Sequence, residues 1–252
     1  MITREGTRRE VAADCLACFG MMLVIFAMLL TSFQLAIYGD PDYKFYEKEY
    51  QKYHVTDSLG MKLDDVMKVT DYMMDYLIGR EEELSIVTEV DGREQDFFNE
   101  QDRFHMGEVR DLFLGGLRLR NGCAAAALLL LLGAGFWKAD FKRLLPKAYL
   151  RAVLIWLAWG SLLAVAFTVD FTWCFTIFHE IFFDNDLWMF NPSEDYMIRM
   201  LPEGFFSDMV IRIGVTFLGM TAALGIVFII WRKSIFYYTK IWYNRLVQSV
   251  GW

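Results

Sequence analysis

The chain has 252 residues, of which 56% are hydrophobic and 17% aromatic, and its mean hydropathy is positive. These values exceed those of an ordinary soluble domain, while the 23% of charged residues is too high for a bare bundle of membrane spans. We therefore predict a protein with both membrane-spanning and water-exposed parts. The formal charge of −7 argues against nucleic acid as a partner, because binding a phosphate backbone requires a basic surface.

Four apolar stretches are long enough to cross a hydrocarbon layer about 30 Å thick, which takes roughly 20 helical residues. The first, with the cytoplasmic N-terminus, occupies residues 1–38, lacks a small-residue cleavage site and is expected to be retained. The other three are expected at residues 112–137, 152–173 and 209–231. The expected fold class is a mostly α, polytopic membrane protein with four transmembrane helices.

Orientation follows from the distribution of Lys and Arg, because positively charged residues near span ends stay in the cytoplasm. Such residues precede the first span, fill residues 138–151 and follow the last span in residues 232–252. The acidic segments 39–111 and 174–208 are therefore expected outside the cell membrane. This gives an N-in, C-in topology with one sizeable extracytoplasmic domain between the first and second spans.

The segment 39–111 is expected to be a small, α-rich domain. Its string KLDDVMKVTDYMMDYLIGR repeats apolar residues near the helical period and predicts an amphipathic helix. The string ELSIVTEVDGREQDFF is richer in β-branched residues, and Asp91-Gly92 within it is a strong hairpin signal. The following FNEQDRFHMGEVRDLF returns to helical spacing. We expect this domain to rest on the membrane or to pack over the spans, because it has little apolar material for a large core of its own.

Two of the three histidines, His105 and His179, fall just outside predicted spans on the same predicted side of the membrane. On a helix, Asp102 and Glu108 lie three residues to either side of His105, so each can approach its imidazole. A carboxylate there would fix the tautomer and raise the basicity of the ring. The alternative is a solvated helix face without chemistry. His54, in a polar segment, is expected to be a surface residue.

His179 lies in a segment where aromatic residues alternate with polar ones, including Asn185 and Asp186. Polar groups within aromatic surface are costly unless they are paired or functional. Trp and Tyr are also ordinary anchors at a membrane interface, so structural anchoring stays an equal alternative.

Other chemistries fit the sequence less well. Cys174 lies five residues from His179, a spacing at which two helical side chains do not face each other. A metal site needs three or more ligands at workable spacing, which the scattered carboxylates and the two histidines do not offer. The sequence also contains no phosphate-binding glycine loop for nucleotide use and no GxSxG or SxxK motif for serine hydrolysis. We therefore expect direct general acid–base catalysis with no cofactor, no metal and no nucleotide. The four cysteines imply no framework of extracellular disulfides.

Two strings, FNEQDRFHMGEVRDLF and FHEIFFDNDLWMFNPSEDYMIRMLPEGFF, together with the four-span plan, are similar to the lipoprotein intramolecular transacylase family over essentially the whole chain. The resemblance implies a bacterial cell-membrane enzyme whose active site lies at the outer leaflet. It would move the sn-2 acyl chain of S-diacylglyceryl-cysteine to the α-amino group of the same cysteine, giving a lyso-form lipoprotein. Its partners would be diacylated lipoproteins and membrane lipids.

Under this resemblance His105 is expected to act as the base, oriented by Asp102 or Glu108, with His179 polarising the ester, stabilising the oxyanion or relaying a proton. The sequence leaves open which histidine does which. The supporting and substrate-binding residues are expected to be Asp102, Glu108, Arg110, Asn185, Asp186 and Trp188.

Two other functions remain open. One is a membrane scaffold or sensor that binds a lipid or peptide without chemistry, which would tolerate loss of either histidine. The other is a lipid hydrolase that uses the same histidines, with water replacing the amine.

Overall fold

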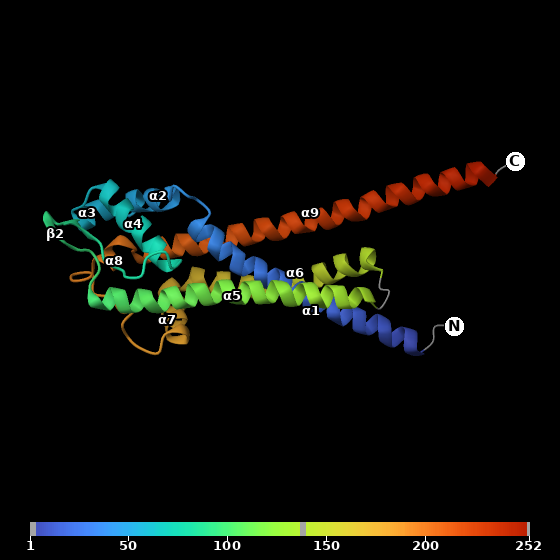
Figure 1. The fold of residues 1–252 in the computed structure, drawn as a ribbon, viewed down its shortest axis with the longest axis horizontal. Coiled ribbons are helices and arrows are strands. Elements are labelled where there is room, and N and C mark those ends of the chain that lie inside the picture. The colour runs from blue at the N-terminus through green and yellow to red at the C-terminus, as the bar shows by residue number, and fades with distance from the viewer. Residues whose placement is uncertain (1–3, 137–139, 251–252) are drawn as a thin grey trace. The chain divides into compact units, whose positions relative to one another are not determined.

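The computed structural model describes the backbone of residues 4–136 and 140–250 and the side chains of residues 8–136 and 140–233. Most of the described chain is α-helical, with one antiparallel pair of strands (Figure 1). In chain order the elements are α1 (Arg4–Tyr38), α2 (Lys44–Lys52), α3 (Val55–Leu59), α4 (Leu63–Leu77), β1 (Val87–Val90), β2 (Arg93–Asp96), α5 (Glu100–Phe136), α6 (Phe141–Val169), α7 (Phe171–Phe182), α8 (Tyr196–Met200) and α9 (Glu203–Val250).

Four helices within the described residues are long and apolar enough to cross a membrane, as the sequence predicts. They occupy Arg8–Tyr38, Glu100–Phe136, Phe141–Val169 and Glu203–Lys233. Residue 137, the expected end of the second span, lies outside the described residues. Two boundaries differ from expectation. Residues 141–151, expected within a loop, already belong to α6, and the expected third span 152–173 contains a helix break at Asp170.

The chain divides into two compact units. The first comprises residues 1–29, 120–160 and 216–252. Small residues four positions apart, Ala13 with Ala17 and Ala148 with Ala152, are buried in its core. Small side chains let helices approach closely where lipid supplies no hydrophobic driving force. The Trp156 ring also stacks on Phe26 at a centroid distance of 5.5 Å.

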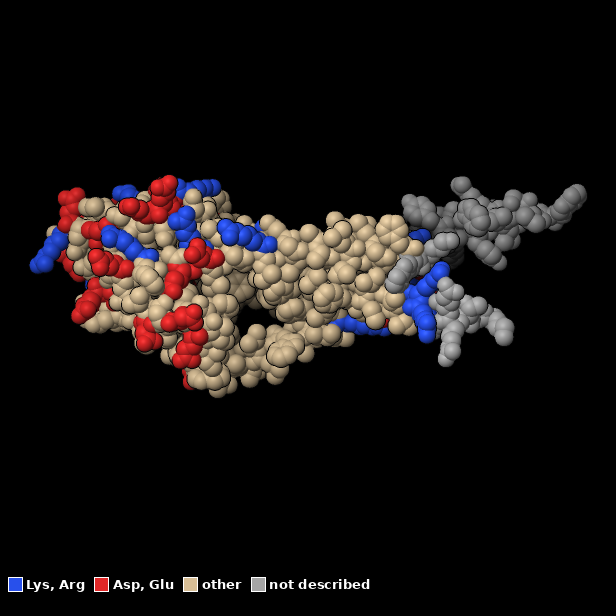
Figure 2. Space-filling view, turned by 60° about the horizontal axis from the view of Figure 1, so that its bottom comes forward, with Lys and Arg blue, Asp and Glu red and all other residues tan. Residues whose placement is uncertain are grey.

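The second unit comprises residues 30–119 and 161–215 and carries the short helices and the strand pair. Asp and Glu gather over the end of this unit that holds α2 to α4, while the apolar helical stretches show a broad surface without charge (Figure 2). Helix α4 coincides with the expected amphipathic helix and buries one face. The core around Tyr50, Phe97 and Phe98 also receives Met200 and Phe205 from the acidic segment 174–208. The small domain therefore completes its core with residues from outside 39–111.

The hairpin turn occurs where the sequence places it. Val90 pairs with Arg93 across the turn, and both central residues have positive φ, 50° at Asp91 and 74° at Gly92. Two consecutive positive φ values define a type I′ turn, whose twist matches that of paired strands and which favours Asp-Gly. The Asp-Gly signal is thereby confirmed.

Gly204, near the start of α9, is required by a close contact with Tyr53. A Cβ at Gly204 would lie 2.4 Å from the Tyr53 ring, and that ring is held because Tyr53 donates a 2.6 Å hydrogen bond to Asp208. We expect Gly204→Ala to lower the free energy of unfolding by about 1–3 kcal/mol through overpacking. Thermal unfolding in detergent measures this. Gly214→Ala on the same helix has open space and should be neutral or stabilising; equal melting temperatures for the two variants would contradict the account.

Candidate active site

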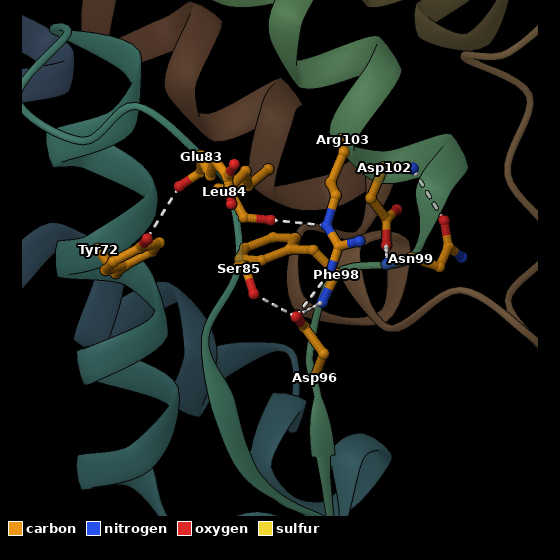
Figure 3. A network of polar contacts seen from close by, with 9 residues as sticks. All are labelled: Tyr72, Glu83, Leu84, Ser85, Asp96, Phe98, Asn99, Asp102 and Arg103. Carbon is orange, nitrogen blue, oxygen red and sulfur yellow. Dashed lines mark hydrogen bonds and ion pairs between the residues drawn. The ribbon is translucent and has the colours of Figure 1, made fainter.

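Helix α5, which carries His105, begins with a reciprocal capping pair. The backbone N–H of Asn99 donates to Oδ2 of Asp102 at 3.0 Å, and the backbone N–H of Asp102 donates to Oδ1 of Asn99 at 2.9 Å (Figure 3). This arrangement satisfies amide groups that a helix start otherwise leaves unpaired. Asp102 is fully buried and serves the helix start. Asp102 was expected to orient His105. Its Oδ2 instead caps the helix, and its Oδ1 has no hydrogen-bond partner among the described side chains.

The side-chain amide of Asn99 also ties α5 to the segment that follows α7. It donates to Oδ1 of the buried Asp195 at 2.6 Å, and Oδ2 of Asp195 accepts from the Asn191 backbone at 2.6 Å. Gln101 adds hydrogen bonds to the carbonyls of Leu187 and Met189. The segment carrying Asn185 and Trp188 is therefore fixed against the first turn of α5.

Arg103 holds the other side of the same turn. Its guanidinium donates to the Leu84 carbonyl at 2.9 Å and to Asp96 at 2.6 Å, and Asp96 also accepts from Ser85 (Figure 3). The start of α5 is thus attached to the strand pair on one side and to the segment after α7 on the other.

Asn99→Ala is expected to destabilise the protein by about 1–3 kcal/mol, because it removes a helix cap and leaves Oδ1 of the buried Asp195 without its donor. Chemical or thermal unfolding in detergent measures the change. Glu100→Ala replaces the exposed neighbouring residue in the same helical turn and should change stability little. Equal stability of the Asn99 and Glu100 variants would show that the cap and the Asp195 link contribute nothing.

The structure brings the two expected imidazoles together within the second unit. The ring centroids of His105 and His179 are 5.8 Å apart with an interplanar angle of 29°, and both residues are buried, with exposed fractions of 5% and 7%. Aromatic rings surround them. Phe183 and Phe190 lie against His105, while Phe175 and Trp188 lie 4.1 Å and 4.7 Å from the His179 ring. Two groups able to transfer protons thus share one largely apolar enclosure.

The tautomer of His179 follows from its hydrogen bond. Nδ1 lies 2.7 Å from the carbonyl oxygen of Phe175, one turn earlier on α7. A carbonyl only accepts, so Nδ1 carries the hydrogen and Nε2 of the neutral ring keeps its lone pair. Burial lowers the pKa of His179 below its ordinary value, opposed by the Phe175 bond, which raises it. The ring is therefore an uncharged proton acceptor at neutral pH.

This depressed pKa predicts a pH dependence of stability. Above pH 6.5 His179 is neutral in the folded and unfolded states alike and contributes no slope. As pH falls below 6.5, the unfolded chain binds the proton more readily than the folded one, so the free energy of unfolding decreases. We expect the melting temperature to fall more between pH 7 and pH 5 in the wild-type protein than in His179→Gln. Identical pH profiles would contradict a buried, neutral His179.

Glu108 faces His105 from the next turn of α5. Its Oε2 lies 4.0 Å from Nδ1 of His105, and neither atom has a hydrogen-bond partner among the described side chains. The other carboxylate oxygen, Oε1, accepts a 2.8 Å hydrogen bond from Asn185. Asn185 in turn accepts from the Leu187 backbone. Asn185 therefore holds Glu108 so that its free oxygen points to the imidazole.

Two expected residues lie away from the pair. The Arg110 guanidinium sits over the Tyr76 ring, 4.8 Å from its centroid, and Asp186 is exposed. Within the described part of the chain, no hydrogen bond, ion pair or ring contact joins either side chain to the two imidazoles. His54 lies on the surface, with a side chain 80% exposed, as expected.

The sequence reasoning missed Phe175, whose carbonyl accepts from His179. It also missed four further residues that build or support the site, namely Asn99, Asp195, Phe183 and Phe190. One signal was available, because Asn99-Glu-Gln-Asp102 is close to a capping-box pattern. The link from Asn99 to Asp195 and the positions of the two phenylalanines depend on tertiary packing, which single-sequence spacing does not encode.

Comparison with known proteins decides the family. The family model described as lipoprotein intramolecular transacylase Lit matches residues 18–206, which include both histidines. The chain belongs to this family. A search of curated proteins found no significant match. The family name implies acyltransferase activity on lipoproteins, and the four long apolar helices agree with a membrane location.

Solved structures extend the likeness to the whole transacylase chain. The membrane-integral lipoprotein intramolecular transacylase Lit from Bacillus cereus is 19% identical, with a TM-score of 0.66 over 96% of this chain and 99% of that one. Structures of its histidine-to-arginine and histidine-to-alanine variants are each 18% identical with a TM-score of 0.67, covering 91% of this chain. They cover 94% and 96% of the respective variant chains. At this identity the likeness establishes the membrane-integral fold.

Proposed function

We propose that the protein moves the sn-2 acyl chain of the S-diacylglyceryl-cysteine of a bacterial lipoprotein to the α-amino group of the same cysteine. The product is a lyso-form lipoprotein. The observation that carries the proposal is the close pairing of two buried imidazoles, His105 and His179, from different helices. An intramolecular N-acyl transfer needs proton transfers but no external acyl donor. Paired histidines can carry out such proton transfers near neutral pH.

The two histidines receive different roles from their hydrogen-bonding positions. With Nδ1 facing the Glu108 carboxylate at 4.0 Å, His105 keeps Nε2 free to act as a base. His179 donates through Nδ1 to the Phe175 carbonyl, so its Nε2 accepts a proton and does not donate one to an oxyanion. We therefore assign His105 as the general base of the acyl transfer and His179 as the acceptor that relays the first proton from the α-ammonium to water.

The reaction balances without a covalent enzyme intermediate. After the ammonium has lost its first proton, the amine nitrogen attacks the carbonyl carbon of the sn-2 ester. The second N–H proton passes to His105, which donates it to the sn-2 glyceryl oxygen as the C–O bond breaks. The products are an amide and a free glyceryl hydroxyl. Amine and ester arrive in one molecule, so proximity replaces a nucleophilic step.

The proposal includes an orientation in the membrane. Lys and Arg in residues 138–151 and 232–252 favour an N-in, C-in topology, which puts the acidic second unit and the histidines at the outer leaflet. Lipoprotein headgroups and N-terminal cysteines are accessible there. Asn185 acts by holding Glu108, and Trp188 packs against the His179 ring at a centroid distance of 4.7 Å.

A crossover experiment with mass spectrometry tests the proposal. Purified protein is incubated with two diacylated lipopeptides, one of which carries deuterated acyl chains and a distinct peptide sequence. We expect each product to keep its own acyl chain and total mass, with fragment ions that place the chain on the α-nitrogen.

Other outcomes identify other functions. Loss of one fatty acid from the lipopeptide would indicate a hydrolase, and exchange of deuterated chains would indicate transfer between molecules. Unaltered lipopeptides, with folded protein that binds them, would favour a scaffold or sensor. Each of these results contradicts the proposed intramolecular transfer.

A further inference from the structure

Helix α7 exposes apolar side chains that no part of the second unit covers. Trp173, Phe178, Ile181 and Phe182 are all more than 40% exposed, and Ile181 reaches 69%. Several large apolar residues exposed within a 12-residue helix exceed the scattered apolar exposure of an ordinary surface. The helix therefore presents a face suited to an apolar environment.

The opposite face of α7 belongs to the site. Phe175 and His179 lie one turn apart, and Phe175 packs on Phe206 while His179 packs on Trp188 and His105. At 100° per residue, Ile181 and Trp173 lie about 160° and 120° around the helix from His179. The exposed Phe178 and Phe182 form the edge of the apolar face nearest the site. Helix α7 thus carries exposed apolar side chains and one of the two imidazoles of the site.

The apolar face continues from a candidate membrane span. Helix α6 ends at Val169, which is 80% exposed, and Asp170 alone separates it from α7. Asp170 caps α7 by accepting from the Trp173 backbone at 2.9 Å. Twelve helical residues extend about 18 Å, which is too short to cross a layer about 30 Å thick. A helix of this length that follows directly on a span can contact the layer from one side but cannot cross it.

The charged residues around α7 indicate how deep the helix lies in the membrane and what contacts its apolar face. Residues 170–198 contain no Lys or Arg, so attraction to anionic headgroups does not hold this segment. Glu180 and Asp184, which are exposed, require water, while Trp173 suits the interface between water and hydrocarbon. This combination fits a helix in the boundary between headgroups and acyl chains.

We propose that the exposed face of α7, formed by Trp173, Phe178, Ile181 and Phe182, lies among the acyl chains of the bilayer. On the other face of the helix, His179 is then held at the depth of the glyceryl esters. This second statement rests on the proposed function, because it assumes that an acylated glyceryl group is the substrate. The first statement concerns the lipid contact alone and does not depend on activity.

Spin labels test the lipid contact in the full chain reconstituted into phosphatidylcholine vesicles. Ile181→Cys is compared with Val87→Cys, a similarly exposed apolar residue on β1, and with Leu218→Cys in the span of α9. The labelling background replaces the four native cysteines, which are Cys15, Cys18, Cys123 and Cys174. We expect the labels at Ile181 and Leu218 to collide with oxygen in preference to a water-soluble nickel complex. The label at Val87 should show the reverse preference.

Two results would overturn the lipid contact. The first is an Ile181 label as accessible to the nickel complex as the Val87 label. The second is an Ile181 label shielded from both colliders and broadened by dipolar coupling, because that pattern means that two copies of the chain pair through α7.

An activity measurement tests the depth of His179. In vesicles that contain a diacylated lipopeptide, we expect Ile181→Glu to lower the initial rate of acyl transfer at least tenfold, while Ile181→Leu and Val87→Glu retain the wild-type rate. Retained activity in Ile181→Glu would overturn the link between lipid contact and catalysis. A wild-type protein without transacylase activity would refute the proposed function and the depth of the esters, whereas the collision data would still decide the lipid contact.

Discussion

His105→Ala and His179→Ala are each expected to lower the rate of acyl transfer by about 10²–10⁴-fold, the contribution typical of a positioned acid–base group. The rings lie 5.8 Å apart among aromatic side chains, and alanine leaves no group in their place that transfers a proton. Initial rates on a diacylated lipopeptide, followed by mass spectrometry with purified protein, measure the loss.

His54→Ala is the matched control, because it removes the third histidine from an exposed position far along the chain from the pair. It should retain the wild-type rate. Thermal unfolding of each variant separates lost chemistry from lost folding. A wild-type rate in a folded His105 or His179 variant would refute the acid–base assignment and would favour the scaffold function.

Glu108→Gln is expected to lower the rate by about 10²-fold, because the imidazole of His105 loses its negative partner. The separation of 4.0 Å is longer than a hydrogen bond, so the loss should stay below that seen when a directly bonded carboxylate is neutralised. Glutamine keeps the size of the side chain and an oxygen that accepts from Asn185. The variant thus changes charge with little change in packing.

Glu100→Gln supplies the comparison for Glu108, since it neutralises an exposed carboxylate on the same helix. It should leave the rate unchanged. Equal rates for the Glu108 and Glu100 variants would exclude Glu108 as the orienting group and leave Asp102 as the remaining candidate.

The parts of the fold that follow from local chemistry were predictable from the sequence. The type I′ turn at Asp91-Gly92 depends on two adjacent residues, and α4 depends on an apolar period within 15 residues. The break at Asp170 was missed because the apolar residues continue on both sides of it. A single capping aspartate inside such a run gives little signal in a hydropathy pattern.

Within the site, the sequence predicted the two histidines but not how they are held. Helical spacing made Asp102 and Glu108 equivalent neighbours of His105. The structure separates them, because Asp102 pairs with Asn99 whereas Oε2 of Glu108 lies 4.0 Å from Nδ1 of His105. Arg110 could have been set aside from spacing alone. Five residues at 100° each turn it about 140° from His105, toward Tyr76.

The double variant His105→Ala with His179→Ala tests most directly whether the two imidazoles act as one catalytic unit. Residues that act together show strongly non-additive losses, because removing one already abolishes the contribution of the other. We therefore expect the double variant to transfer acyl chains about as slowly as either single variant. Losses that multiply in the double variant would mean that the two histidines act independently, and would contradict the shared site.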